Sequence, residues 1–175
     1  EIYALSFSYG QKQIAEIKKI KQFLQKYKIK EHKIISIDLK AFGKSSLTDD
    51  NMEVPHYKQV SDIGSEIPTT YVPARNTIFL SYAIAFAEIQ DASEIFIGVH
   101  ATDYSNYPDC RLEYIKSFES MANFAIAKGT KGNKLTIQTP LINMTKTEIV
   151  AMGLKMGVDY SSTISCYHPD INDNS

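Results

Sequence analysis

Apolar residues along this chain alternate between two spacings, and this alternation limits the possible folds more than any other feature. Four times, a short apolar run typical of a buried strand precedes a longer segment with the apolar spacing of an amphipathic helix. The strand-like segments are residues 2–7, 33–39, 94–99 and 135–137, and the helix-like segments are residues 12–27, 75–90, 112–127 and 145–156. Strands that alternate with helices favour parallel pairing through right-handed crossovers. The sequence therefore predicts an α/β fold with a doubly wound, mostly parallel sheet and helices on both faces.

Length and charge narrow the class of protein. With 175 residues, 43% of them hydrophobic, the chain can bury one sizeable core, so we expect a single domain over residues 1–175. Its 19 Lys and Arg against 20 Asp and Glu residues argue against an electrostatic nucleic-acid binder. The sequence has no apolar run long enough to span a membrane. Two cysteines make no disulfide framework, which favours a cytoplasmic setting. Because the chain opens without Met and closes in a polar tail, we expect further residues at both ends.

Four polar segments lie where a parallel α/β sheet binds ligands, beyond the carboxyl ends of its strands. They are residues 8–11, 72–76, 99–111 and 139–146. The third segment is dense in hydroxyls and carboxylates and ends in a guanidinium, which indicates a site for a small polar molecule. A plain surface turn is the alternative interpretation. In the first segment Gly10 permits a close approach of backbone to a ligand, and a simple strand-to-helix turn explains it equally well.

Two cations stand in the first turn of expected helices. Arg75 and Lys146 place positive charge where the helix dipole is also positive, which is unfavourable. A bound phosphate or carboxylate would offset this, so both residues are candidate anion ligands. Solvation without any ligand is the alternative for both.

The last expected helix carries its own start and stop signals. Thr145 is a good N-cap, and Glu148 stands at the position that completes a capping box. Gly157 is a natural C-terminal stop.

The histidines show no metal-binding spacing among themselves. Cys166 and His168 form a Cys-x-His pair, which alone is weak evidence for metal, because a structural zinc site needs four ligands.

Five motifs in this chain resemble, in their order, those of the 7-cyano-7-deazaguanine synthases of the PP-loop (N-type ATP pyrophosphatase) superfamily. They are Tyr9-Gly10-Gln11, Val72-Pro73-Ala74-Arg75-Asn76, residues 102–111, Pro140-Leu141 with Lys146-Thr147-Glu148, and Ser165-Cys166-Tyr167. The resemblance covers nearly the whole chain, and the block at residues 107–111 and the block at residues 72–76 are its most specific parts. It implies a Rossmann-like fold of the adenine nucleotide alpha hydrolase type.

The resemblance implies an ATP-dependent ligase that converts 7-carboxy-7-deazaguanine and ammonia into 7-cyano-7-deazaguanine, a precursor of queuosine. A carboxylate is a poor electrophile, so adenylyl or phosphoryl transfer first creates a leaving group and ammonia then forms an amide. A second activation of the amide oxygen permits dehydration to the nitrile. The family also implies ATP with Mg²⁺ and Zn²⁺ as cofactors, small molecules as the binding partners, and a homodimer.

The resemblance assigns roles to individual residues. It implies Lys146 and Arg75 as catalytic cations that face phosphate or developing charge. Tyr9, Gly10 and Gln11 are expected to border the adenosine end of ATP. The expected substrate-binding residues are Asp103, Tyr107, Asp109, Arg111 and Asn76. Among these, a carboxylate can accept two hydrogen bonds from a guanine-like edge, and Arg111 can pair with the substrate carboxylate.

Two family elements are expected outside the given residues. The Ser-Gly-Gly-x-Asp-Ser phosphate loop should precede Glu1, and a Cys-x-x-Cys-x-x-Cys cluster should follow Ser175. Cys166 is then the first ligand of a structural zinc site, and residues 163–175 begin the zinc-binding segment. Two alternatives remain: another PP-loop amidating or tRNA-modifying ligase, against which residues 107–111 speak, and a non-catalytic nucleotide-binding homologue, which a missing phosphate loop would suit.

Overall fold

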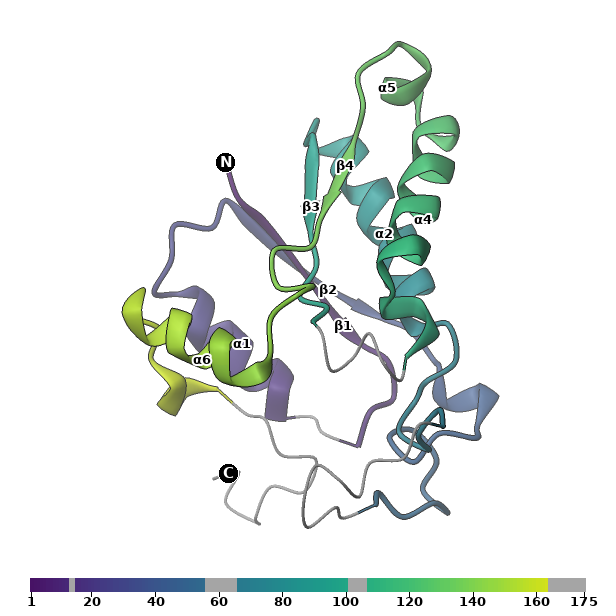
Figure 1. Ribbon diagram of the computed structural model, residues 1–175, viewed down its shortest axis with the longest axis vertical. Helices are drawn as coiled ribbons and strands as arrows, with labels where there is room; N and C mark the ends of the chain where they lie inside the picture. The colour runs from purple at the N-terminus through teal and green to yellow at the C-terminus, as the bar shows by residue number, and fades with distance from the viewer. Residues whose placement is uncertain (13–14, 56–65, 101–106, 164–175) are drawn as a thin grey trace. The chain divides into compact units, whose positions relative to one another are not determined.

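The computed structural model describes residues 1–12, 15–55, 66–100 and 107–163 (Figure 1). Strands and helices alternate along the described chain, as the sequence predicts. The elements are β1 (Tyr3–Ser8), α1 (Ala15–Leu24), β2 (Glu31–Ser36), η1 (Lys40–Phe42), α2 (Arg75–Ile89), β3 (Glu94–Phe96), η3 (Pro108–Cys110), α4 (Leu112–Ala125), α5 (Ala127–Thr130), β4 (Thr136–Gln138), α6 (Lys146–Lys155) and η4 (Tyr160–Ser162). Among these residues, no helix combines the length and hydropathy needed to cross a membrane.

Each strand pairs in parallel with one neighbour. β1 runs beside β2, with Tyr3 opposite Glu31 and Ser8 opposite Ser36. β3 runs beside β4, with Glu94 opposite Thr136. The parallel α/β prediction is confirmed. The described strands form two sheets of two strands each, so the finer prediction of one doubly wound sheet stays a prediction.

The chain divides into two compact units, and each sheet lies in its own unit. Unit 1 comprises Glu1–Ile63, Pro68–Pro73 and Val158–Ser175, and unit 2 comprises Gly64–Ile67 and Ala74–Gly157. The expectation of a single domain is not tested by this division and stays a prediction.

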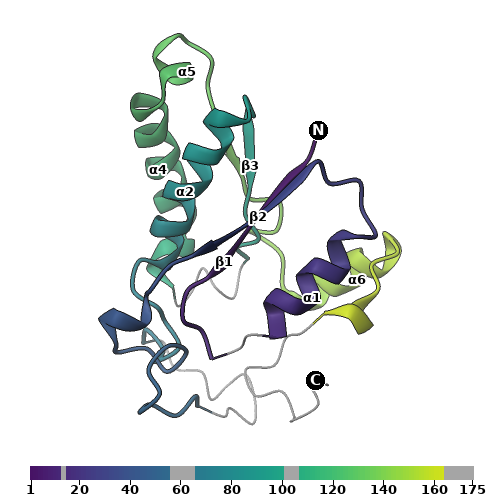
Figure 2. The same cartoon turned by 180° about the vertical axis from the view of Figure 1, so that it is seen from behind.

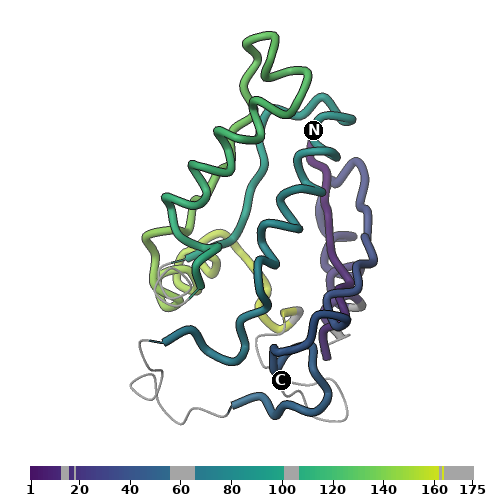
Figure 3. The backbone as a smooth tube through the Cα atoms, turned by 90° about the vertical axis from the view of Figure 1, so that its right-hand side faces the viewer, coloured from purple at the N-terminus to yellow at the C-terminus, as the bar shows by residue number. Residues whose placement is uncertain are grey.

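The core of unit 2 lies where α2 and α4 pack against the sheet of β3 and β4. Its most buried side chains come from both helices and from β4, and α2 and α4 run side by side in the ribbon and tube views (Figures 2 and 3). The cluster consists of Leu80, Ile115, Phe118, Ala122 and Ile137. A second cluster of Ala87, Ile126 and Leu135 continues it. The apolar stripe predicted for residues 112–127 therefore faces the core. The stripe predicted for residues 75–90 is wrong, because α2 turns Leu80 and Ala87 to the core and leaves Tyr82 and Ile89 exposed.

Two α4 side chains bond to the outer edge of β4. The Ile137 amide donates to the Glu119 carboxylate at 2.5 Å. The Leu135 amide donates to Asn123 Oδ1, and Asn123 Nδ2 donates back to the Leu135 carbonyl, each at 2.8 Å. Thr136 instead donates from its amide to the carbonyl of Ser93, on the β3 side. Because groups along a strand alternate in direction, α4 closes the edge of β4 that faces away from β3.

Several predicted elements end earlier than expected, among them the strand over residues 94–99 and the helix over residues 112–127. The strand expected to reach residue 99 ends at Phe96, although the Ile97 amide still donates to the Gln138 carbonyl. Its partner β4 stops at Gln138, just before Thr139 and Pro140, and proline has no amide to donate to a ladder. The helix expected to reach residue 127 ends at Ala125 because Ile126 is extended and buried, and a separate short helix follows.

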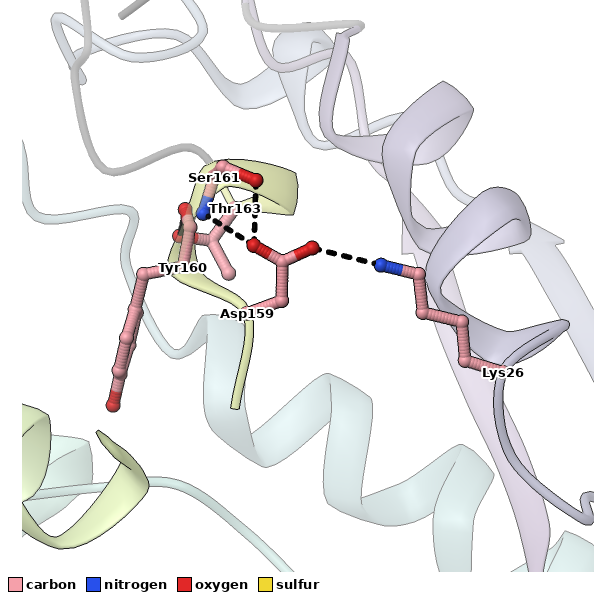
Figure 4. A network of polar contacts seen from close by, with 5 residues as sticks. All are labelled: Lys26, Asp159, Tyr160, Ser161 and Thr163. Atoms are coloured by element: carbon pink, nitrogen blue, oxygen red, sulfur yellow. Dashed lines mark hydrogen bonds and ion pairs between the residues drawn. The ribbon is translucent and has the colours of Figure 1, made fainter. Parts of the chain in front are cut away.

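The chain after residue 157 belongs to unit 1 and is tied to the segment that follows α1. Lys26 Nζ donates to Asp159 at 2.9 Å, and the other Asp159 oxygen accepts from the Ser161 amide at 3.1 Å (Figure 4). Both partners of the ion pair are half exposed, so the pair itself contributes little. The extended piece expected over residues 163–166 lies, from residue 164 on, outside the described residues.

Candidate functional site

The turn after β1 is braced by the side chain of Gln11. Gln11 Oε1 accepts from the Tyr9 amide at 2.7 Å, and Gln11 Nε2 donates to the Phe7 carbonyl at 3.3 Å. The Tyr9 carbonyl accepts from the Leu39 amide at 3.3 Å. Tyr9 and Gln11 are both buried. In unit 1 the Gln11 side chain and the Tyr9 backbone therefore shape the turn.

Gly10 is the exposed residue of this turn, and two features of the structure require a residue without a side chain here. Its φ of +82° lies in the left-handed region that favours glycine. A Cβ at this position would lie 2.9 Å from Lys40 Cβ. Lys40 forms an ion pair with Asp50, and this pairing raises the pKa of the lysine and lowers the pKa of the carboxyl. Gly10 is thus the exposed residue of this turn, and Lys40 packs closely beside it.

A buried polar turn follows, which the sequence prediction treated only as connection. Ser45, Ser46 and Thr48 are almost fully buried. The Leu47 carbonyl accepts from the Lys12 amide at 3.1 Å, which joins this turn to the residue after Gln11. Within the described chain, Thr48 Oγ1 has no hydrogen bond. Three hydroxyl residues and two acidic residues within positions 45–50 are the available signal, but this composition is also typical of exposed turns.

The start of α2 brings together two of the predicted residues. The Asn76 amide donates to Asp109 Oδ2 at 2.9 Å, and Asn76 Nδ2 donates to the Asp109 carbonyl at 3.2 Å. Asn76 Nδ2 also lies 3.2 Å from Cys110 Sγ. Asn76, Asp109 and Cys110 are all buried. We call these three residues the Asn76–Asp109 clasp.

A guanidinium lies on each side of the clasp in sequence. Arg75 is half-buried in the first turn of α2, with its Cζ 5.8 Å from the centre of the Phe79 ring. Arg111 is exposed, and its Nε donates to the Pro108 carbonyl at 3.1 Å. Tyr107 is half-buried and its carbonyl accepts from the Cys110 amide at 3.0 Å. Unit 2 therefore brings Asn76 and Asp109 into contact and holds Arg111 on the turn beside them.

Lys146 stands on a helix start of a different kind. Thr145 Oγ1 accepts from the Glu148 amide at 3.3 Å, and the Thr145 amide donates to Glu148 Oε2 at 2.7 Å. The capping box predicted from the sequence is confirmed. Hydrogen bonds from the backbone and then the side chain of Thr145 lower the pKa of Glu148. Lys146 follows this cap directly and is exposed.

Two predicted site residues, Asp103 and Cys166, lie outside the described residues. Among the described residues, no group of three or more His, Cys, Asp and Glu side chains could hold a metal ion. Cys110 is buried in the clasp. The predicted Zn²⁺ and Mg²⁺ sites therefore stay predictions.

Comparisons with known proteins agree along the whole chain. A family model described as "Queuosine biosynthesis protein QueC" matches residues 1–175. A 7-cyano-7-deazaguanine synthase of Rickettsia akari (strain Hartford) is 58% identical over 175 residues, which are 100% of this chain and 77% of the relative. Proteins of the same name from Rickettsia prowazekii (strain Madrid E) and Rickettsia bellii (strain OSU 85-389) are 57% and 58% identical over 175 residues, 100% of this chain and 77% and 76% of theirs. These matches confirm the resemblance drawn from the five motifs.

Proposed function

The chain belongs to the QueC family of queuosine biosynthesis proteins, and from this membership we propose that it converts 7-carboxy-7-deazaguanine into 7-cyano-7-deazaguanine. The observation that carries the proposal is the identity of 57% and 58% to curated synthases across all 175 residues. The reaction consumes ammonia and ATP. ATP supplies the adenylyl or phosphoryl group that turns a carboxylate or amide oxygen into a leaving group.

In this proposal the residues of unit 2 bind and activate the substrate. Arg111 is the strongest candidate for the substrate carboxylate, because a guanidinium pairs with a carboxylate through two hydrogen bonds. Its side chain is exposed, and only its Nε is engaged among the described residues. Asp103 and Tyr107 are proposed to contact the deazaguanine, and Asp109 and Asn76 belong to the same site.

Arg75 and Lys146 are proposed to stabilise charge that develops on phosphate and on the reacting oxygen. Preorganised cations of this kind act without reorganising during the reaction. The first turn of a helix adds its own amides and dipole to such a site. Both residues stand in a first helical turn, which supports this role.

Tyr9, Gly10 and Gln11 are proposed to border the adenosine end of ATP. The exposure of Gly10 supports this role, because glycine places no side chain of its own between its backbone and a ligand. The buried Gln11 would act by holding the turn.

The remaining parts of the proposal rest on the family resemblance. They are Mg²⁺ with ATP, a structural Zn²⁺ held by Cys166 and cysteines beyond Ser175, a homodimer in the cytoplasm, and one doubly wound sheet that includes all four strands. Parallel pairing in both observed sheets supports the last of these.

The test uses the full-length protein with 7-carboxy-7-deazaguanine, ammonia, ATP and Mg²⁺. We expect the nitrile product by mass spectrometry, and calorimetry should show weaker substrate binding for Arg111→Ala than for Lys116→Ala, an exposed control on α4. Amide as the final product would indicate a different amidating ligase. Nucleotide binding without any product would indicate a non-catalytic homologue.

A further inference from the structure

The first turn of α2 lacks the local features that normally start a helix. Its N-cap position holds Ala74, whose side chain cannot accept a hydrogen bond, and no acidic residue stands in the first turn. Ala74 also adopts φ +54° and ψ +23°, a left-handed conformation that L-residues other than glycine rarely adopt. Arg75 adds a positive charge at the positive end of the helix dipole. Local sequence therefore does not explain why the helix begins here.

The missing acceptor comes from Asp109, 33 residues further along the chain. Its Oδ2 accepts from the Asn76 amide at 2.9 Å, which is the second residue of the helix. In return, the Asn76 side chain donates through Nδ2 to the Asp109 carbonyl at 3.2 Å. This reciprocal arrangement has the logic of a capping box, but its two halves come from distant parts of the sequence.

The Asp109 carboxylate is committed to this helix. It is 6% exposed, and a buried carboxylate needs compensation for its lost hydration. In the described chain, its only hydrogen bond is with the Asn76 amide, and it forms no ion pair there. The compensation therefore comes from the N-terminal dipole of α2, which corresponds to about half a positive charge.

The clasp also fixes the backbone positions from which the Arg75 and Arg111 side chains extend. Arg75 directly precedes Asn76 on α2, and Arg111 follows Asp109 by two residues and is held to the same turn through Pro108. A change in the clasp would move both backbone segments relative to each other. Among the described residues, the clasp links these two segments directly, and a hydrogen bond of 2.8 Å between the Thr77 and Tyr114 hydroxyls joins α2 to α4 just beyond it.

We propose that Asp109 and Asn76 are positioning residues, which hold Arg75 and Arg111 in register for the substrate rather than contacting the substrate themselves. This inference rests on the proposed function and refines it. It assigns the recognition of the substrate carboxylate to the arginines and leaves recognition of the guanine-like edge to other residues.

Hydrogen exchange of the Asn76 backbone amide in the full-length protein tests the clasp directly. We expect Asp109→Ala to speed this exchange about tenfold or more, the effect of losing one cap. Asp109→Asn keeps an oxygen acceptor but loses the charge, so its exchange should rise less, by about threefold. Asp91→Asn is the matched control, since its carboxylate is exposed in the same unit and its φ of +56° is tolerated by asparagine. Unchanged exchange in both Asp109 variants would overturn the clasp.

Calorimetry with 7-carboxy-7-deazaguanine then separates positioning from contact. Positioning predicts that saturating substrate leaves the Asn76 amide protected, and that Asp109→Asn binds within about fivefold of the wild type. Lost binding in Asp109→Asn with Asn76 exchange as in the wild type would establish direct contact and overturn the proposal. If Asp109→Ala does not fold, Asp109→Asn alone decides both measurements. A wild type that bound no substrate would overturn the proposed function, whereas the exchange result would still decide the clasp.

Discussion

The helices α2 and α6 each begin with a cation, yet their starts are built in different ways. α6 is capped by Thr145 and Glu148, both within the first turn and directly around Lys146. α2 starts at Arg75 with no cap of its own and takes its acceptor from Asp109 on η3. A helix start that places a charged group can therefore be local, or it can depend on the tertiary fold.

The N-terminal caps of α2 and α6 differ in which parts of the fold they need in order to form. The α6 cap is exposed and needs only its own turn, so it should form whenever the helix forms. The α2 cap is buried and needs η3 to be docked. We therefore expect α2 to lose its start when unit 2 loosens, and four measurements test this difference between the two helices.

The largest effect should come from removing the cations. We expect Arg75→Ala and Lys146→Ala each to lower turnover about 10²–10³-fold, the scale for losing one preorganised group that stabilises developing charge. Steady-state kinetics on the full-length protein measures this. Lys155→Ala, an exposed lysine at the other end of α6, should leave turnover unchanged. Full activity in Arg75→Ala or Lys146→Ala would remove that residue from the proposed site.

The second effect concerns the stability of α2. We expect Asp109→Ala to lower the free energy of unfolding by about 1–3 kcal/mol, because it leaves the buried amide of Asn76 without an acceptor. Denaturation with urea measures the loss, and Asp91→Asn serves again as the exposed control. A smaller loss of stability in Asp109→Ala than in Thr145→Ala, the variant of the α6 cap, would mean that Asp109 does not stabilise the start of α2.

The third effect concerns the local cap. We expect Thr145→Ala to cost about 1 kcal/mol, the typical value for losing an N-cap. Thr145→Ser keeps the hydroxyl and should restore most of this stability. If the cap positions Lys146, turnover should also fall in Thr145→Ala. Normal turnover together with lowered stability would show that the position of Lys146 does not depend on the cap.

The smallest effect is a pH dependence of the α6 start. The pKa of Glu148 is lowered by its bonds with Thr145, so its contribution is complete above the ordinary carboxyl pKa and is lost as pH falls through the lowered value. We expect the protection of the first α6 amides, relative to the unfolded chain at the same pH, to fall in that acidic range. Glu148→Gln should show this lower protection already at neutral pH and no further loss of protection on acidification. An identical acid response in the wild type and Glu148→Gln would exclude Glu148 as its cause.

The contrast between the two helix starts also explains what the sequence could predict. Thr145 and Glu148 are three residues apart, so a short window contains the whole α6 cap, and the prediction is confirmed. The hydrophobic spacing likewise located all eight expected strands and helices, with ends shifted by a few residues. These are properties of neighbouring residues.

Properties that join distant residues were harder to read. In the sequence, Arg75 is a positive charge at a helix N-terminus, and a bound anion would offset its unfavourable interaction with the helix dipole. The structure places the carboxylate of Asp109 at the same helix end, and a separation of 33 residues gives no periodic signal. The same limit applies to the buried turn at Ser45, whose hydroxyl residues are typical of exposed loops. The family resemblance predicted that Asn76 and Asp109 belong to one site, because family motifs group residues that lie far apart in the sequence. It did not predict the hydrogen bonds that join them.

The closed edge of β4 has a consequence for how the protein avoids aggregation. Exposed strand edges recruit strands from other molecules, since their amides and carbonyls are ready to pair. Glu119 and Asn123 already occupy these groups at Leu135 and Ile137, so an incoming strand would have to displace both side chains. Within the described part of the chain, a strand that extends this sheet is therefore directed to the edge of β3 that faces away from β4, because α4 closes the opposite edge of the sheet.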